Sequence, residues 1–268
     1  MDKYDFMEGN TKIHIGLIAA MPEEVGSALD NINIIEEKEF GDLKIHTGKW
    51  FLDKEKNNYL YISVVWSGWG KVSAARAVTR LISMQQDIEP VNLIFFTGLA
   101  GGTNKSLSQG DIVVPTSVMM HDMDARPLFE RFEIPPLRLK KLYPNSQLTN
   151  FIQNTLIEAI KTGDLKFFKK VRRGIVATGD KFISDNETLN LLCKDIPDLL
   201  AVEMEGAAVA QIAIQENIPW ILLRVISDSA NDDASQTFSQ FLSTYKDYSW
   251  ALVEVILQKY KNLYEYLK

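Results

Sequence analysis

Three acidic residues and one arginine stand where this chain could assemble a chemical site. Glu24 follows an apolar run, Glu205 comes just before a helix-like segment, and Asp228 follows a second apolar run at residues 220–226. Arg224 is a permanent cation inside that second run, and a buried unpaired cation is very costly, so it needs an acidic or polar partner. Sites in parallel α/β sheets form at the carboxyl ends of strands. These four side chains therefore make one candidate site if their strands share a sheet.

Carboxyl groups at such an edge can break the bond between a sugar carbon and a heteroatom. One acid donates a proton to the leaving group, a second activates water, and nearby negative charge stabilises the oxocarbenium-like transition state. The two roles need different pKa values, which burial and neighbouring groups set. Cleavage of a glycosidic bond is thus a chemistry that Glu24, Glu205 and Asp228 could support.

Alternating strands and helices must position these residues. Polar and apolar residues alternate through residues 34–65, which predicts a β-meander with turns at 41–42 and 53–58. Buried strands are predicted at residues 13–20, 91–96, 112–114, 169–178 and 220–226, and helices at 72–84, 146–162, 186–193, 206–216 and 238–268. This order predicts an α/β fold in three αβα layers, with a central mixed, twisted β-sheet. No linker divides residues 1–268, so we expect a single domain, with a flexible arm at 1–11.

Two glycine-containing segments could bring the backbone close to a ligand. Residues 67–71 (SGWGK) lead into a predicted helix, and residues 97–102 (TGLAGG) follow a predicted strand. Glycine allows such close approach. Neither segment has the spacing of a Walker A loop or of the dinucleotide-binding GxGxxG motif. A tight turn and a ligand contact both stay open for SGWGK, and a phosphate cradle is one option for TGLAGG.

Composition excludes several classes of partner. The formal net charge is −6 and no strongly basic tract occurs, so we expect no nucleic-acid partner. No apolar run approaches about 18 residues, and the acidic start lacks the apolar stretch of a signal peptide, so we expect no membrane association. Cys193 is the single cysteine, which excludes an intramolecular disulfide and fits the reducing cytoplasm. One histidine and two aspartates in residues 121–124 match no standard zinc pattern, so we expect no metal.

Two further segments could lie near a ligand. Residues 121–142 are irregular, with three prolines and mixed charge, and we expect a loop at an interface or over a pocket. Phe182 and Ile183 follow the strand predicted at 169–178, where an aromatic ring could cover a planar ligand. A place in the core is the alternative for Phe182.

Seven motifs together resemble those of the nucleoside phosphorylase/nucleosidase superfamily, and within it the 5′-methylthioadenosine/S-adenosylhomocysteine nucleosidases. They are IGLIAAMPEEV (15–25), SGWGKVSAA (67–75), FFTGLAGG (95–102), GDIVVP (110–115), ATGDKFI (177–183), AVEMEGAAVA (201–210) and RVISDSAND (224–232). The resemblance implies hydrolysis of the N-glycosidic bond of an adenine nucleoside, in nucleoside catabolism and methionine salvage, without a metal or organic cofactor. It also implies a homodimer, in which residues 121–136 of one subunit close the partner's pocket.

The resemblance assigns the four charged residues to separate tasks. Asp228 would be the general acid that protonates N7 of the purine. Glu24 would activate the attacking water, and Arg224 would help to place Glu24 or that water. Glu205 would hold the ribose hydroxyl groups.

The resemblance also implies which residues surround the substrate. Phe182 would stack on adenine, the Ile183 backbone would bind its edge, and Ser227 would support Asp228. Met204 would lie against the sugar. The remaining predicted binding residues are Met21, Phe238 and Trp69 on the sugar and 5′ side, Ala100 and Gly101 in the glycine-rich segment, and Glu203, for which no catalytic task is assigned and a structural role stays open.

Two departures from the family pattern leave alternatives open. Leu99 stands where these nucleosidases usually have a small hydroxyl residue near the water, and Trp69 replaces a smaller aliphatic residue near the 5′ group. A purine nucleoside phosphorylase on the same fold is one alternative. The acids of MPEE (21–24) disfavour it, because phosphorylases of the superfamily tend to carry an arginine there. A non-catalytic nucleoside-binding or storage protein is the other, and the three acids argue against it.

Overall fold

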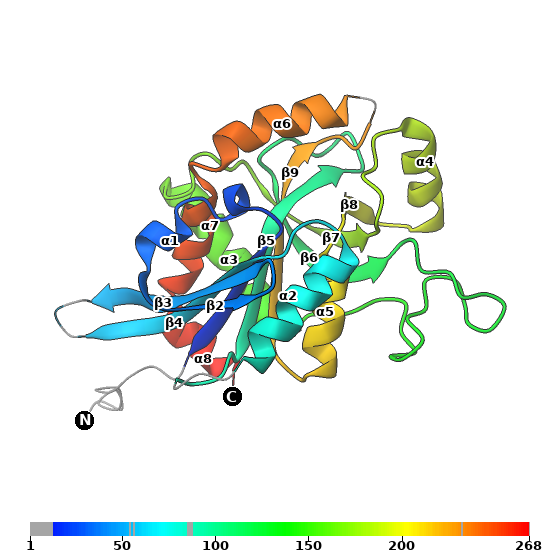
Figure 1. Cartoon of the computed structure of the whole chain (residues 1–268). Coiled ribbons are helices and arrows are strands. Elements are labelled where there is room, and N and C mark those ends of the chain that lie inside the picture. Colours follow the sequence, from blue (N-terminus) through cyan, green and yellow to red (C-terminus); the bar gives the residue numbers. More distant parts are fainter. Residues whose placement is uncertain (1–12, 54, 56, 85–87, 232, 268) are drawn as a thin grey trace.

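A mixed β-sheet forms the centre of the molecule (Figure 1). The computed structural model describes residues 13–53, 55, 57–84, 88–231 and 233–267, so the arm expected at 1–11 lies outside the described residues. Across the described residues the sheet has nine strands in the order β2-β3-β4-β1-β5-β8-β7-β6-β9. Their bounds are β1 His14–Ala19, β2 Asn33–Phe40, β3 Leu43–Asp53, β4 Asn58–Trp66, β5 Leu93–Gly102, β6 Ile112–Met120, β7 Val171–Thr178, β8 Leu199–Glu203 and β9 Trp220–Asp228.

Helices cover both faces of this sheet, as predicted for three αβα layers (Figure 1). Apolar side chains alternate between the faces along each buried strand, so Phe95 faces one helical layer and Phe96 the other. The helices are η1 Pro22–Glu24 (a 3₁₀ turn), α1 Ala28–Asn31, α2 Lys71–Ser83, α3 Ser146–Thr162, α4 Asn186–Asp195, α5 Gly206–Gln215, α6 Ala234–Tyr245, α7 Ser249–Leu257 and α8 Tyr260–Glu265. Helices α2 and α5 pack together on one face, and α3 and α7 pack together on the other.

The single long helix predicted at residues 238–268 is wrong. The structure has three helices there, α6, α7 and α8. Helix α6 packs against β9 and η1, whereas α7 packs against α3. One straight helix could not follow both surfaces, so the chain turns twice and each helix buries its own apolar side chains, among them Tyr245, Trp250 and Leu263.

The strand pairings bring four strand ends together. The predicted meander is confirmed, because β2, β3 and β4 pair antiparallel in sequence. Strand β1 runs parallel to β4 and β5, and β5 runs parallel to β9. Strand β9 also pairs with β6, and β5 with β8, so β5, β8, β7, β6 and β9 close into a small barrel. The carboxyl ends of β1, β5 and β9 therefore share one edge, with the end of β8 beside β5.

The glycine-rich segment at 97–102 belongs to a strand rather than to a turn. Strand β5 continues to Gly102, and β9 continues to Asp228, both further than predicted. In this register Gly98 pairs with Arg224, and Gly101 pairs with Asp228. Glycine within a strand often marks close approach by another group, and here the neighbouring side chains approach β5 closely.

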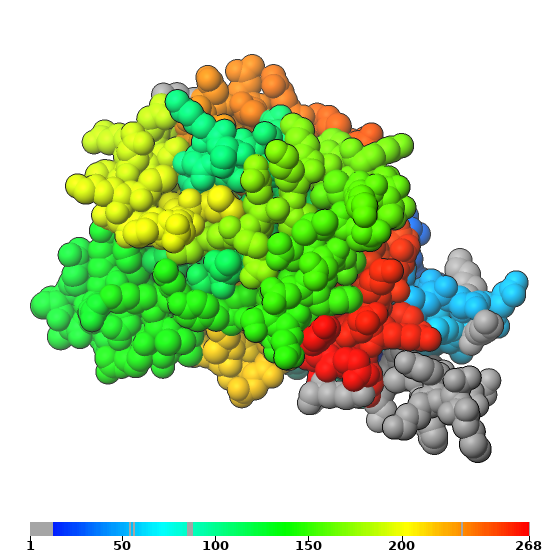
Figure 2. All heavy atoms as spheres, turned by 180° about the vertical axis from the view of Figure 1, so that it is seen from behind, coloured from blue at the N-terminus to red at the C-terminus, as the bar shows by residue number. Residues whose placement is uncertain are grey.

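The 121–142 segment projects sideways from the molecule below α4, at the right of Figure 1 and at the lower left of Figure 2. It leaves the sheet at the end of β6, and isolated bridges join Val118 to Leu142 and Ile134 to Leu139. Leu128 in this projection is 83 % exposed. None of the helices in the described ranges is long and apolar enough to cross a membrane.

We expect the contribution of His14 to the stability of the protein to be lost in mildly acidic solution. This ring is fully buried in β1, where Nδ1 donates to the Glu89 carbonyl (2.6 Å) and Nε2 lies 2.8 Å from Ser63 Oγ. Burial lowers the pKa of His14, so the folded state favours the neutral ring. The stabilisation is complete above the unfolded pKa of about 6.5 and is lost as the pH falls below it.

Urea unfolding between pH 8 and pH 5 measures this effect. The His14→Gln variant lacks the titrating ring and should lose less stability over that interval than the native protein. Equal losses in the two proteins would contradict the assignment.

Candidate active site

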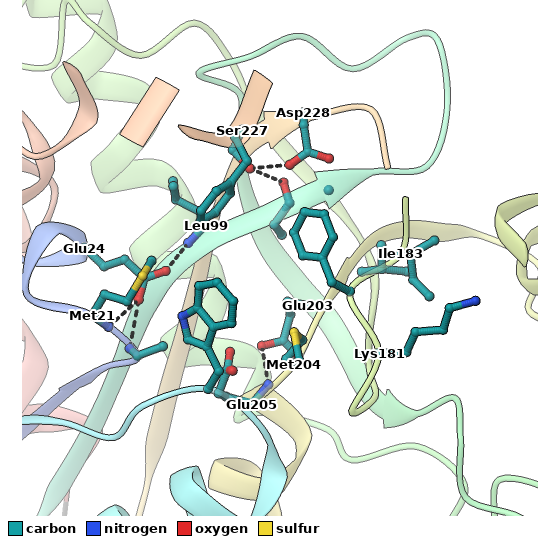
Figure 3. A pocket seen from close by; sticks show the side chains of 17 residues that line it. Met21, Glu24, Leu99, Lys181, Ile183, Glu203, Met204, Glu205, Ser227 and Asp228 are labelled. Carbon is teal, nitrogen blue, oxygen red and sulfur yellow. Dashed lines mark hydrogen bonds between the residues drawn. The ribbon is translucent and has the colours of Figure 1, made fainter. Parts of the chain in front are cut away.

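A pocket lies at the shared edge of β1, β5, β8 and β9 (Figure 3). Every predicted site residue except Arg224 lines it, namely Met21, Glu24, Trp69, Ala100, Gly101, Phe182, Ile183, Glu203, Met204, Glu205, Ser227, Asp228 and Phe238. Ala20, Lys181 and Val202 also line the pocket and were not predicted. Each is the chain neighbour of a predicted residue, and that adjacency is the signal that could have found them.

Glu24 is held in the pocket wall by three backbone N–H groups. The turn η1 folds its carboxyl group back, so that Oε2 accepts from the N–H groups of Ala20 (2.8 Å) and Met21 (3.1 Å). Its Oε1 accepts from the N–H of Leu99 (2.8 Å). Burial raises the pKa of Glu24, although Arg224 and these N–H groups act in the opposite direction. A fixed carboxyl group with a raised pKa suits a general base that takes a proton from water.

Leu99 binds Glu24 through its backbone N–H group. Its side chain packs in the apolar layer that also contains Phe95 and Tyr245, and its N–H points to Glu24. The missing hydroxyl group at this position therefore leaves the hydrogen bond between β5 and Glu24 intact.

Arg224 is paired with Glu203 and not with Glu24. Its Nε and Nη2 donate to Glu203 Oε2 at 3.2 and 2.5 Å, and Glu205 Oε2 lies 3.8 Å from Nη2. Both members of the main pair are buried. The arginine reaches β8 by crossing β5 above Gly98, where an added β-carbon would lie 2.5 Å from Nη1. A side chain at this position would press on the guanidinium group and on Glu24, so glycine suits the crossing.

Glu203 also ties β8 to the start of α5. Its Oε2 accepts from the backbone N–H groups of Glu205 (3.1 Å) and Gly206 (2.7 Å). Its Oε1 accepts from the Thr178 hydroxyl, whose oxygen in turn accepts from the N–H of Ala207 (2.8 Å). Free N–H groups and the helix dipole favour an anion at a helix start. Glu203 therefore fixes both the buried cation and the turn that carries Glu205.

Glu205 presents its carboxyl group to the pocket from that turn. Gly70, at the start of α2, donates its N–H to Glu205 Oε1 (2.8 Å). Burial and then the negative charge of Glu203 raise the pKa of Glu205 to about 8. A carboxyl group in this state can exchange hydrogen bonds with the hydroxyl groups of a sugar.

Asp228 stands at the end of β9, across the pocket from Glu24 (Figure 3). Ser227 Oγ donates to its Oδ2 (2.7 Å), and the N–H of Ala230 donates to its Oδ1 (2.8 Å). Burial raises the pKa of Asp228, while these two donors lower it. A raised pKa allows the carboxyl group to keep a proton closer to neutral pH and to donate it.

One donor of Arg224 faces Glu24. Nη1 is buried and has no hydrogen-bond partner among the described residues. A β-carbon added at Gly98 would lie 2.4 Å from Glu24 Oε1 and 2.5 Å from this Nη1. The acceptor and the donor therefore both press against Gly98, which leaves no room there for a methyl group.

Three aromatic rings from separate elements line the mouth of the pocket. Phe238 of α6 meets Trp69 edge to face, with ring centres 6.4 Å apart, and meets Phe182 in the same way at 6.0 Å. Phe182 and Ile183 follow β7, and Ile183 is buried. Rings of this kind favour flat or apolar ligand groups. Within the described ranges, no group of three or more His, Cys, Asp or Glu residues is arranged to hold a metal ion.

This fold and this pocket define a class of proteins. A family model described as "Phosphorylase superfamily" matches residues 14–258. The match includes every strand from β1 to β9 and all the carboxylates of the pocket. The chain is therefore a member of that superfamily.

Individual relatives define the branch. The 5′-methylthioadenosine/S-adenosylhomocysteine nucleosidase of Bacillus licheniformis is 35% identical over 245 residues, which cover 89% of this chain and 96% of that protein. The solved structure of the Neisseria meningitidis nucleosidase of the same name, in complex with methylthio-immucillin-A, superimposes with a TM-score of 0.80 at 26% identity, covering 92% of this chain and 99% of that one. The chain belongs to the 5′-methylthioadenosine/S-adenosylhomocysteine nucleosidases, which are N-glycosidases, and the resemblance drawn from its motifs is confirmed.

A third similar structure carries a different name. The native futalosine hydrolase of Helicobacter pylori superimposes with a TM-score of 0.79 at 25% identity, covering 92% of this chain and 98% of that one. Individual side chains, rather than the fold, must therefore distinguish the nucleosides that such proteins accept.

We expect Gly98→Ala to lower kcat strongly. The new methyl group would meet Glu24 Oε1 at 2.4 Å and Arg224 Nη1 at 2.5 Å, so one or both must move. Displacing a catalytic group by about 1 Å can cost about 100-fold in rate. Steady-state rates of adenine release, with thermal unfolding measured in parallel, test this expectation.

Gly102→Ala is the matched control. It lies on the same strand, and its new methyl group would meet its nearest neighbours at 3.2 Å. A Gly98→Ala enzyme as active as this control would show that the close approach of Glu24 and Arg224 to Gly98 has no part in catalysis.

Proposed function

We propose that this protein hydrolyses the N-glycosidic bond of adenine nucleosides that carry a 5′-thioether, methylthioadenosine or adenosylhomocysteine, and releases adenine. The observation that carries the proposal is the position of Asp228 and Glu24 across one pocket from each other, with Glu205 on a third side (Figure 3). An acid on one side of a glycosidic bond and a base on the other is the arrangement that hydrolysis requires. Membership of the nucleosidase family supports the same reaction.

Asp228 protonates the leaving base. Its proton passes to N7 of the purine while the bond between C1′ and N9 breaks, and the bonding electrons leave with adenine. Ser227 Oγ and the N–H of Ala230 hold the carboxyl group and stabilise the carboxylate that remains. Phe182 stacks on the purine ring, and the Ile183 backbone binds its edge.

Glu24 activates the attacking water. Glu24 Oε1 binds this water from the pocket wall, and Nη1 of Arg224, which has no partner among the described residues, lies close to the same carboxyl group. Glu24 takes one proton while the water oxygen bonds to C1′. Until it takes that proton, the negative charge of Glu24 stabilises the positive charge that develops on the ribose.

The sugar is held between Glu205 and the side chain of Met204. Glu205 accepts from the ribose hydroxyl groups, and its own position is fixed by the N–H of Gly70. Met21, Phe238 and Trp69 lie on the 5′ side, and Ala100 and Gly101 line the wall beside Asp228. Glu203 acts indirectly, because its carboxylate is occupied by Arg224, Thr178 and the start of α5.

The decisive experiment is Asp228→Asn assayed for adenine release. The amide cannot donate the proton of a carboxylic acid, so turnover should fall by at least about 100-fold, the usual worth of a general acid, while thermal unfolding stays close to that of the native protein. The native enzyme should turn over without phosphate. An Asn variant with near-normal turnover would remove Asp228 as the acid, and a strict phosphate requirement that yields ribose 1-phosphate would replace hydrolysis by phosphorolysis.

The pH profile should be bell-shaped. Glu24 acts ionised and its pKa is raised by burial, so kcat/KM falls as the pH drops through that pKa. Asp228 acts protonated and its pKa is also raised by burial, so kcat/KM falls again as the pH rises. A profile that stays flat on its alkaline side in the native enzyme would contradict the role of Asp228.

The chain forms a homodimer in this proposal and acts as a single domain in the cytoplasm. The dimer is supported by the projecting 121–142 segment, which exposes Leu128 and Leu139. The expected contact of residues 121–136 with the partner's pocket would cover Leu128. Cys193, half-buried and unpaired, fits a reducing compartment.

Sedimentation velocity tests this assembly. The native protein should sediment as two chains, and Leu128→Asp should shift it towards one chain. Leu191→Asp, at another exposed leucine on α4, is the control and should leave the assembly unchanged. A native protein that sediments as a single chain would overturn the dimer.

A further inference from the structure

Lys71 makes contacts that the proposed reaction does not use. It is the first residue of α2, and its Nζ lies 2.5 Å from Asp122 Oδ1 and 3.5 Å from Asp180 Oδ2. Its backbone N–H donates to Asp180 Oδ1 (2.8 Å). Asp122 Oδ2 in turn accepts from the backbone N–H of Asp180 (2.9 Å). These three residues, which we call the charged clamp, join the start of α2 to the loops that follow β6 and β7.

The turn before α2 connects the charged clamp to Glu205. Gly70 directly precedes Lys71 and donates its N–H to Glu205 Oε1 (2.8 Å). Gly70 has a positive φ of 92°, and a β-carbon added there would lie 3.1 Å from Asp180 Oδ1. The turn therefore packs against the charged clamp, and a shift of Lys71 would move the N–H that holds the carboxyl group of Glu205.

The loops on the other side of the charged clamp are fixed by the sheet. His121, beside Asp122, is buried, and its N–H donates to the Thr178 carbonyl (2.9 Å). Its ring lies against Gly179, where an added β-carbon would be 2.2 Å from Cε1. Gly179 donates its own N–H to the Glu203 carbonyl (3.1 Å). The loops after β6 and β7 are thus a firm support for the turn before α2.

The charged clamp differs from an ordinary surface ion pair. An isolated exposed pair contributes little to stability, because water and salt screen it. Here one ammonium group, on a side chain that is only 19 % exposed, contacts two carboxyl groups, and a backbone N–H holds each carboxylate as well. Without the ammonium group the two carboxylates would repel each other across the clamp. Its main effect is therefore on the position of the turn.

We propose that Lys71 is a positioning residue for ribose recognition, because the charged clamp fixes the turn whose backbone N–H orients the carboxyl group of Glu205. The inference rests on the proposed function, in which Glu205 binds the ribose hydroxyl groups. Lys71 does not line the pocket, so it acts only through Gly70 and Glu205.

The test compares methylthioadenosine with its 2′-deoxy and 3′-deoxy analogues, each of which lacks one ribose hydroxyl group. In Lys71→Met, kcat/KM for methylthioadenosine should fall by about 10-fold, the worth of one hydrogen bond to a charged group, mainly through a higher KM. An analogue that lacks the hydroxyl group bound by Glu205 should lose much less. The ratio of kcat/KM for the parent to that for the analogue should therefore fall by about 10-fold for at least one analogue.

Two further substitutions at these positions separate positioning from simple loss of structure. Lys71→Arg keeps a cation within reach of both carboxyl groups and should restore most of the native ratio. Asp122→Ala opens the charged clamp from the other side and should lower the same ratio. The double variant Lys71→Met/Asp122→Ala should be no worse than the worse single variant, since both substitutions remove the same contact. Losses that multiply in the double variant would contradict a shared action.

Arg76→Met is the matched control. It removes a cation from the same helix, where Arg76 Nη1 lies 2.7 Å from Asp42 Oδ1, and Arg76 does not line the pocket. Its ratios and its thermal unfolding should stay close to the native values. Equal falls in kcat/KM for the parent and both analogues in Lys71→Met would overturn the inference and leave Lys71 a structural residue. A native enzyme that releases adenine from none of these nucleosides would instead overturn the proposed function.

Discussion

The buried contact between Arg224 and Glu203 is the constraint on which the rest of the site depends. A cation inside a central strand is tolerated only when it is paired and hydrogen-bonded, and removing one partner of such a pair typically costs about 3–5 kcal/mol. Glu203 meets this need while it also accepts two N–H groups at the start of α5. One carboxylate therefore joins β9, β8 and α5, and the position of Glu205 follows from it.

The contact between Arg224 and Glu203 also involves Gly98. Its missing side chain lets Arg224 cross β5 and leaves room for Glu24 to approach from η1. Burial then acts on the carboxyl groups that this crowding brings together, and it raises the pKa values of Glu24, Glu205 and Asp228. The packing that holds the sheet together thus also prepares an acid and a base, which is how one pocket can serve both the leaving group and the water.

The mouth of the pocket is built differently from its floor. The floor is fixed by charged groups and backbone N–H groups, whereas the mouth consists of Trp69, Phe238 and Phe182, each from a separate element and joined by ring contacts. The floor and the mouth are therefore held by different kinds of contact, hydrogen bonds to charged groups at the floor and ring contacts at the mouth.

Sequence alone determined the strand–helix order and the meander, because the periodicity of apolar residues is a local property. It also predicted nearly all of the pocket residues, because the motifs AVEMEGAAVA (201–210) and RVISDSAND (224–232) resemble those of a known family. Local patterns could not show that the 97–102 segment is a strand or that the last helix is divided into three, since pairing with β9 and packing against α3 decide those features. The partner of Arg224 was likewise decided by tertiary structure. Glu24 and Glu203 are both acids near the site, and only the crossing at Gly98 places the guanidinium on Glu203.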